Sequence, residues 1–127
     1  MAACLFNHLC ERQGLPMRAV SAGVSASEGS QASEFAQAAM KARGLSLLRH
    51  RSKPLSETLL KEVSLVVAMT PEHAQRCMEC FPVLPAPIRW FSPSIQDPFG
   101  GSMASYEKTA HALEAGVHEL IQELAAQ

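Results

Sequence analysis

The run Leu65–Met69 constrains the fold of this chain more than any other feature, because it is wholly apolar and leads straight into a helix start. A continuous apolar run of this length is typical of a strand that is buried on both faces, as in a parallel sheet. Thr70-Pro71-Glu72 then supplies an N-cap, a proline at the first helical position and an acid in the first turn. A buried strand that leads into a helix predicts an α/β protein with right-handed crossovers.

Further helices and strands are predicted on both sides of this run. Helical spacing of apolar residues, with capping residues at the ends, predicts helices over 1–13, 33–43, 56–62, about 71–80 and about 103–125. Short strands are predicted over 17–22 and 88–91. Together with the apolar run they make three strands, which is a small sheet for so many helices.

Length and composition are those of a globular chain. The 127 residues are 47% apolar and 18% charged, with a formal net charge of −1, so we predict a single domain over 1–127. No run of like charge indicates a nucleic-acid or membrane surface, and no apolar run approaches the roughly 18 residues that span a bilayer. The first ten residues lack the basic region of a signal peptide, so we expect a cytoplasmic location and four reduced cysteines.

The segment Asp97-Pro98-Phe99-Gly100-Gly101-Ser102 places one carboxylate on a stiff turn in front of the last predicted helix. Pro98 restricts the residue before it to extended conformations, and the two glycines allow a positive φ or the close approach of another group. A carboxylate held in a fixed position suits a general acid. From these residues alone, Asp97 either protonates a leaving group or caps the turn.

Four segments, in this order and at these spacings, resemble the low-molecular-weight protein tyrosine phosphatase family, and most of all its bacterial protein-arginine-phosphatase branch. They are Ser21-Ala22-Gly23, His50-Arg51-Ser52, the 65–70 run with His73, and the 97–102 turn with Tyr106. The resemblance covers the whole chain. It implies a phosphotyrosine phosphatase I-like, three-layer α/β sandwich with a short parallel sheet. It also implies hydrolysis of phosphotyrosine or phosphoarginine in protein substrates through a phosphocysteine intermediate, with no cofactor.

The resemblance assigns roles to single residues. Asp97 matches the general acid, which afterwards activates the water that breaks the phosphocysteine. Phe99 falls where the family places aromatic residues at the pocket mouth, although it could instead anchor the turn in the core. His50 matches a histidine that hydrogen-bonds the phosphate loop from behind, or it is an ordinary exposed loop residue. Ser21 and Ser52 either support the same loop or serve a strand end and a turn.

The sequence departs from the family at the nucleophile. The family's phosphate loop, Cys-x5-Arg, lies between the first strand and the first helix and is followed by Ser-Pro-Met-Ala, whereas this sequence starts at Met1-Ala2. None of the four cysteines has an arginine six positions later. We therefore expect the first central strand, the nucleophile and the arginine to be missing and the chain alone to be inactive. A misassigned start codon is the favoured explanation; a fragment or a decayed copy are the alternatives.

Two other functions stay open, a non-catalytic remnant that binds a partner and an arsenate reductase of the same fold. Such reductases carry resolving cysteines in the helix after the third strand, but Cys77 and Cys80 are spaced too closely for that pattern. His73, Cys77 and Cys80 share one helix face, yet a tetrahedral zinc site needs a fourth ligand, so no metal is predicted. We expect His73 at the surface, ordinary buried thiols at the cysteines and a phosphorylated protein as the partner. Nucleic acid and membranes are not expected partners, and the oligomeric state is open.

Overall fold

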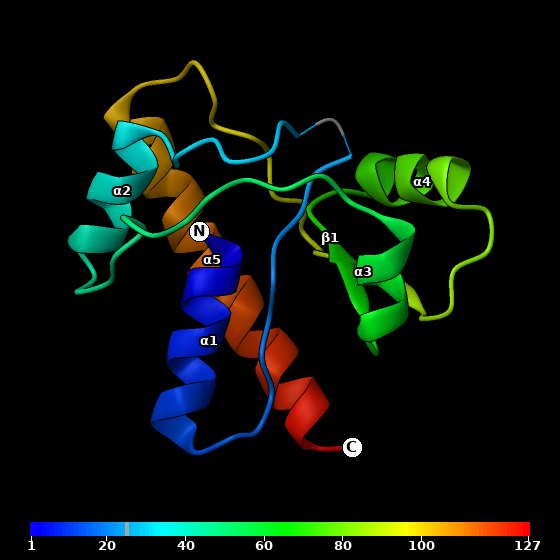
Figure 1. Cartoon of the computed structure of the whole chain (residues 1–127). Coiled ribbons are helices and arrows are strands. Elements are labelled where there is room, and N and C mark those ends of the chain that lie inside the picture. The colour runs from blue at the N-terminus through cyan, green and yellow to red at the C-terminus, as the bar shows by residue number, and fades with distance from the viewer. Residues whose placement is uncertain (25) are drawn as a thin grey trace. The chain divides into compact units, whose positions relative to one another are not determined.

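The computed structural model describes every residue except 25 and divides into two compact units (Figure 1). The first unit consists of Met1–Ser21, Gln31–Arg51 and Asp97–Gln127, and the second of Ala22–Ser30 and Ser52–Gln96. Each unit therefore joins segments that lie far apart in the sequence.

Three helices build the first unit, namely α1 (Ala2–Gln13), α2 (Glu34–Lys41) and α5 (Met103–Ala125), and both α1 and α2 pack against α5. Their ends follow the capping pattern of the sequence. Gly14 ends α1 with a left-handed φ of 68°, which favours glycine. The predicted helices over 1–13 and 103–125 are confirmed, and the predicted helix over 33–43 is two residues shorter because 42–44 form a turn.

The core of the first unit lies along α5. Apolar side chains at helical spacing form one buried stripe on this helix, as its sequence predicts. Leu124 continues the stripe in sequence but is only half-buried, because it lies in the last turn. The core combines side chains from all three helices: Leu5, Phe6 and Cys10 of α1, Ala39 and Met40 of α2, and Tyr106, Ala110, Leu113, Val117, Leu120 and Ile121 of α5.

The second unit contains α3 (Glu57–Glu62), β1 (Val66–Ala68), α4 (Pro71–Cys80) and β2 (Ile88–Trp90). The two strands are parallel, with Val67 opposite Arg89, and α4 packs on both of them. The Thr70 hydroxyl caps α4 by accepting a hydrogen bond from the His73 N–H at 3.0 Å. The α/β class and the short parallel sheet are therefore confirmed.

The predicted strand over 17–22 is wrong, since these residues form no strand. The two backbone groups of Ala19 bond to one side chain instead: its N–H donates to Asn7 Oδ1 at 2.7 Å, and its carbonyl accepts from Asn7 Nδ2 at 3.0 Å. An extended segment becomes a strand only when the backbone of a neighbour pairs with it. Here an amide side chain of α1 takes that place.

The prediction that Leu65–Met69 is buried on both faces is also wrong, because all five residues are half-buried. In the described part of the chain β1 pairs with β2 alone, so the sheet has two strands rather than three. A strand with one neighbour is less covered than a central strand. No helix of the described residues is long and apolar enough to cross a bilayer.

Candidate active site

A pocket of about 440 Å³ opens in the first unit, and all three predicted site residues line it. Asp97 and Phe99 come from the turn before α5, and His50 comes from the loop after α2. The remaining walls are formed by Met1 at the start of α1, the segment 31–33, Ala36, Leu47, Pro98 and Tyr106. The fold thus brings together side chains that lie more than a third of the chain apart in the sequence.

Asp97 caps its own turn and remains exposed to solvent. Its Oδ1 accepts a hydrogen bond from the Phe99 N–H at 3.0 Å, which fixes the carboxylate relative to the backbone. The next turn is closed by the Gly101 N–H, which donates to the Pro98 carbonyl at 2.8 Å. Capping the turn and presenting an acid are therefore compatible in this geometry, because the cap uses one of the two carboxylate oxygens.

Packing ties the Asp97 turn to the first turn of α5. A Cβ atom added at Gly101 would lie 2.8 Å from the Pro98 carbonyl oxygen and 3.0 Å from Ser105 Cβ. The Ser102 hydroxyl caps α5 by accepting from the Ser105 N–H at 3.3 Å. The position of the carboxylate consequently depends on where α5 begins.

Two aromatic side chains line the pocket in different ways. Tyr106 is buried, and its ring meets that of Phe35 edge to face, with ring centroids 5.6 Å apart. Phe99 is 82% exposed, so it does not anchor the turn in the core. Phe35 belongs to the predicted apolar face of α2 yet is 42% exposed, although its ring contacts that of Tyr106.

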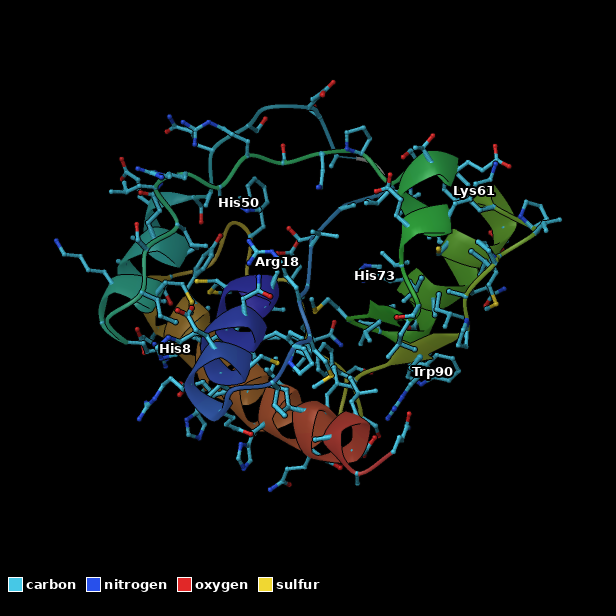
Figure 2. All side chains as sticks on the ribbon, turned by 60° about the horizontal axis from the view of Figure 1, so that its bottom comes forward. His8, Arg18, His50, Lys61, His73 and Trp90 are labelled. Carbon is cyan, nitrogen blue, oxygen red and sulfur yellow. The ribbon has the colours of Figure 1, made fainter. Side chains whose placement is uncertain are left out.

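His50 is half-buried and lies near the start of α1, whereas His8 lies farther along that helix (Figure 2). The Arg51 guanidinium folds back on its own loop and donates to the carbonyls of Leu48 at 2.9 Å and His50 at 2.7 Å. This loop is therefore held by its own polar contacts, which fix the backbone on which His50 stands.

The two serines of the predicted loop support lie outside the pocket. Ser21 is exposed and does not line the pocket. In the second unit, Ser52 accepts from the Ser30 N–H at 3.1 Å and donates to the Ser27 carbonyl. Ser52 thus serves the turn, which is the second of its two predicted roles.

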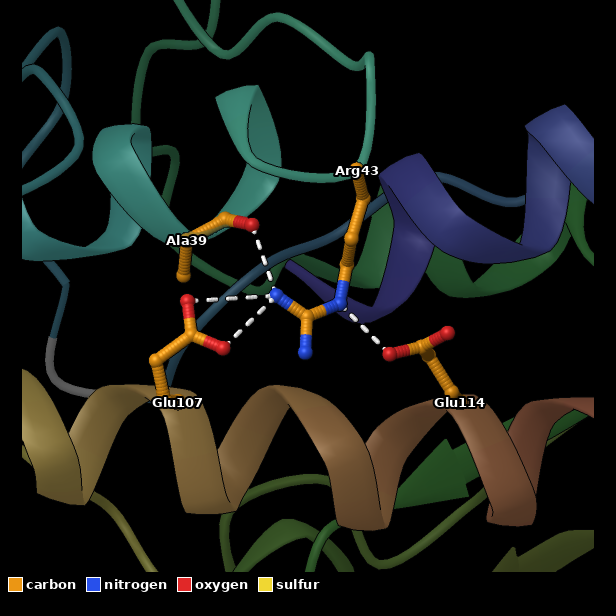
Figure 3. A network of polar contacts seen from close by, with 4 residues as sticks. All are labelled: Ala39, Arg43, Glu107 and Glu114. Carbon is orange, nitrogen blue, oxygen red and sulfur yellow. Dashed lines mark hydrogen bonds and ion pairs between the residues drawn. The ribbon is translucent and has the colours of Figure 1, made fainter.

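Sequence reasoning missed Arg43, the central residue of a polar network between α2 and α5 (Figure 3). Its guanidinium donates to the Ala39 carbonyl at 2.8 Å and pairs with the carboxylates of Glu107, at 3.1 Å, and Glu114. Burial alone would lower the pKa of Arg43, but the two carboxylates outweigh burial and raise it. The seven-residue spacing of the two glutamates, which places them on one face of α5, was the available signal.

None of the four cysteines lines the pocket, and all four are free thiols. Burial raises the pKa of the Cys4, Cys10 and Cys77 thiols, which is the opposite of what activates a thiolate nucleophile. His73 is exposed, as predicted. The described residues contain no group of three or more His, Cys, Asp or Glu side chains arranged to hold a metal ion.

Comparison with known proteins gives a consistent result over the whole chain. The family model described as low molecular weight phosphotyrosine protein phosphatase matches residues 1–127. A protein-arginine-phosphatase of Bacillus subtilis (strain 168) is 36% identical over 134 residues, which include 100% of this chain and 86% of that protein. A protein-arginine-phosphatase of Geobacillus stearothermophilus is 33% identical and aligns with 91% of this chain and 83% of its own length.

Solved structures give the same result for the fold. The crystal structure of a YwlE mutant from Bacillus subtilis superposes with a TM-score of 0.92 at 33% identity, covering 98% of this chain and 88% of that one. A low molecular weight protein tyrosine phosphatase from T. tengcongensis superposes with a TM-score of 0.91 at 32% identity, covering 96% of this chain and 88% of that one.

Proposed function

The chain belongs to the low molecular weight phosphotyrosine protein phosphatase family, and on that premise we propose that its pocket is the acid side of a site that dephosphorylates protein side chains. The family is one of protein phosphatases, and the similar proteins named above are protein-arginine-phosphatases. Asp97 is the general acid in this proposal, His50 and Phe99 contact the phosphate-binding region and the substrate, and no cofactor takes part.

The observation that carries the proposal is the meeting of Asp97, His50 and Phe99 around one pocket with the start of α1. The backbone N–H groups at the start of a helix favour a bound anion. A phosphoryl group placed there would have the carboxylate on one side and an aromatic rim at the mouth. The exposed Phe99 ring suits contact with a side chain that enters from solvent.

Asp97 has two tasks in the proposed reaction. A thiolate displaces the leaving atom from phosphorus, and Asp97 donates its proton to that atom as the bond breaks. The carboxylate then takes a proton from water, which attacks the phosphocysteine and releases phosphate. Pro98 and the bond from the Phe99 N–H to Asp97 Oδ1 support both tasks, because they hold the carboxylate in one position.

The thiolate is not supplied by these 127 residues in our proposal. No cysteine has an arginine six positions later, and none lines the pocket. We propose that a Cys-x5-Arg loop joins the pocket at the start of α1, beside Met1, and that the chain without it does not turn over. A single-domain organisation and a cytoplasmic location stay predictions.

Hydrolysis of p-nitrophenyl phosphate by two proteins tests the proposal. One is the chain as given, and the other carries an apolar strand and a Cys-x5-Arg-Ser-Pro loop directly before Met1. Only the extended protein should turn over, and Asp97→Asn should lower its kcat by about 10²–10⁴-fold, the usual contribution of general acid catalysis. Glu72→Gln, which removes an exposed carboxylate of α4, should leave kcat unchanged. Cysteine-dependent turnover by the short chain would overturn the proposal.

Similarity to two protein-arginine-phosphatases favours phosphoarginine over phosphotyrosine as the substrate. Release of phosphate from matched peptides that carry one or the other, by the extended protein, distinguishes the two. The reading frame upstream of Met1 discriminates the remaining alternatives. An in-frame strand followed by Cys-x5-Arg supports a phosphatase, and a stop codon or unrelated sequence supports a non-catalytic remnant. An arsenate reductase would need thioredoxin-dependent turnover that Cys77→Ser or Cys80→Ser abolishes.

A further inference from the structure

Cys77 and Cys80 form a pair of free thiols at the end of α4 that the proposed phosphatase chemistry does not use. Cys77 is 3% exposed and contributes to the core of the second unit, whereas Cys80 is exposed and is the last residue of α4. Helix geometry puts Cα atoms three residues apart at about 5 Å. That separation lies inside the range of roughly 4.4–6.8 Å found for disulfides.

The end of α4 can supply the small movement that a bond between these thiols requires. Cβ atoms three residues apart on a helix are about 5–6 Å from each other, while a disulfide needs about 4 Å. The last turn must therefore close by roughly 1–2 Å. The last turn of α4 is held by the Phe81 N–H, which donates to the Cys77 carbonyl at 2.9 Å. Phe81 itself already has a non-helical φ of −132°. Closing this turn leaves the earlier turns of α4 in place.

We propose that Cys77 and Cys80 are a redox-active dithiol site, which a two-electron oxidant such as hydrogen peroxide converts into a disulfide within α4. The Cys80 sulfur attacks one peroxide oxygen, the O–O bond breaks, and Cys80 sulfenic acid and one water form. The Cys77 sulfur then attacks the Cys80 sulfur, the S–O bond breaks, and the hydroxyl leaves as a second water with the Cys77 proton. Two thiols lose two electrons, and one peroxide becomes two waters.

Exposure decides the order of these steps. Cys80 meets the oxidant first because it is at the surface, and Cys77 resolves the sulfenic acid from beneath it. Burial, with a contribution from the neighbouring Cys80, raises the pKa of Cys77, so the second step should become faster as the pH rises. Cys4 and Cys10 belong to the other unit; Cys10 is buried in its core, and Cys4 is half-buried with its thiol directed at the Ser46 carbonyl.

Peptide mass spectrometry of the reduced chain, treated with hydrogen peroxide and then alkylated, tests the proposal. Trypsin cuts after Arg76 and Arg89, so the peptide 77–89 contains both cysteines and neither Cys4 nor Cys10. We expect this peptide to appear unalkylated and lighter by two hydrogen atoms, and to return to its alkylated mass after dithiothreitol. A peptide 77–89 that stays fully alkylated, or a dimer joined through Cys80, would overturn the proposal.

Variants and a second probe sharpen the test. Cys80→Ser changes an exposed residue, so the fold should persist while the light peptide disappears; Cys4→Ser should oxidise as the parent chain does. Phenylarsine oxide, which needs two neighbouring thiols, should be retained by the parent chain and by Cys4→Ser during a wash with a monothiol, and lost from Cys80→Ser. Retention by Cys80→Ser would assign the arsenical to other thiols and contradict the pair. None of these results depends on phosphatase activity.

Discussion

Two adjacent glycines shape the turn that carries Asp97, each for a different physical reason. Gly100 has a φ of 80°, in the left-handed region that a side chain rarely adopts. Gly101 lacks a left-handed φ, but a Cβ there would come too close to the Pro98 carbonyl and to Ser105. Backbone conformation therefore selects glycine at the first position, and packing selects it at the second.

Gly101→Ala should lower the free energy of unfolding by about 1–3 kcal/mol, because overpacking against backbone cannot be relieved by a side-chain rotation. Gly100→Asn should lower it by less than about 1 kcal/mol, because asparagine tolerates the left-handed region and open space surrounds this position. Urea denaturation of the two variants and the parent chain measures the difference. Equal losses at the two positions would show that packing against Ser105 is not the constraint.

At the scale of secondary structure, α5 connects the Asp97 turn to the rest of the first unit. Ser102 caps the helix directly after the turn, Tyr106 lines the pocket, and the apolar stripe beyond packs on α1 and α2. Arg43, in the turn that follows α2, adds a polar clamp to Glu107 and Glu114. Glu107 directly follows Tyr106 in the sequence, so the clamp stabilises the part of α5 that forms the pocket wall.

Arg43→Met should lower the free energy of unfolding by about 1–2 kcal/mol. The substitution removes the guanidinium and with it the contacts to three partners, while methionine keeps most of the apolar stem. The expected loss is modest, since the two glutamate side chains are 42% and 45% exposed and solvent screens them. Lys41→Met, which removes an exposed cation at the end of α2, should change stability by less than about 0.5 kcal/mol. Urea midpoints at low and high salt measure both, and a salt-independent loss would argue against the ion pairs.

At the scale of the whole chain, the two units differ in how well buried side chains shield their backbones from local opening. In the first unit, long helices pack around fully buried side chains such as Val117 and Ile121. In the second unit, the sheet is made of two strands of three residues each, all of them half-buried or exposed. Local opening is easier where few buried contacts hold the backbone. We therefore expect the second unit to be the less protected of the two.

Native-state hydrogen exchange should find the slowest amides in the middle of α5, around Val117–Ile121, and faster exchange in β1 and β2. The physical reason is the difference in burial between these segments, which sets the free energy of local opening. Peptide-resolved mass spectrometry after exchange at neutral pH measures the protection of each segment. Strand amides protected as strongly as those of α5 would show that β1 has a second partner in solution.

The sequence determined those elements whose hydrogen bonds are local. A helix bonds each residue to another four positions away, so caps such as Thr70 and Gly14 and the spacing along α5 suffice to place it. The Asp97 turn was likewise visible, because Pro98 and the glycines act on their immediate neighbours. The ordered motifs around Asp97 also predicted the family, which the comparison with known proteins confirms. The site roles of Asp97, Phe99 and His50 stay predictions.

Only the tertiary structure decided which distant residues meet. Residues 17–22 have a strand-like pattern but no strand, because a strand requires a partner backbone and Asn7 bonds to Ala19 instead. The Arg43 clamp joins an arginine to two glutamates that lie far from it in the sequence, so local sequence patterns do not show the contact. The pocket lined by both His50 and Asp97 is likewise formed by residues that lie far apart in the sequence. Local chemistry fixes local conformation, whereas strand pairing, burial and the shape of a site depend on which distant residues the folded chain brings into contact.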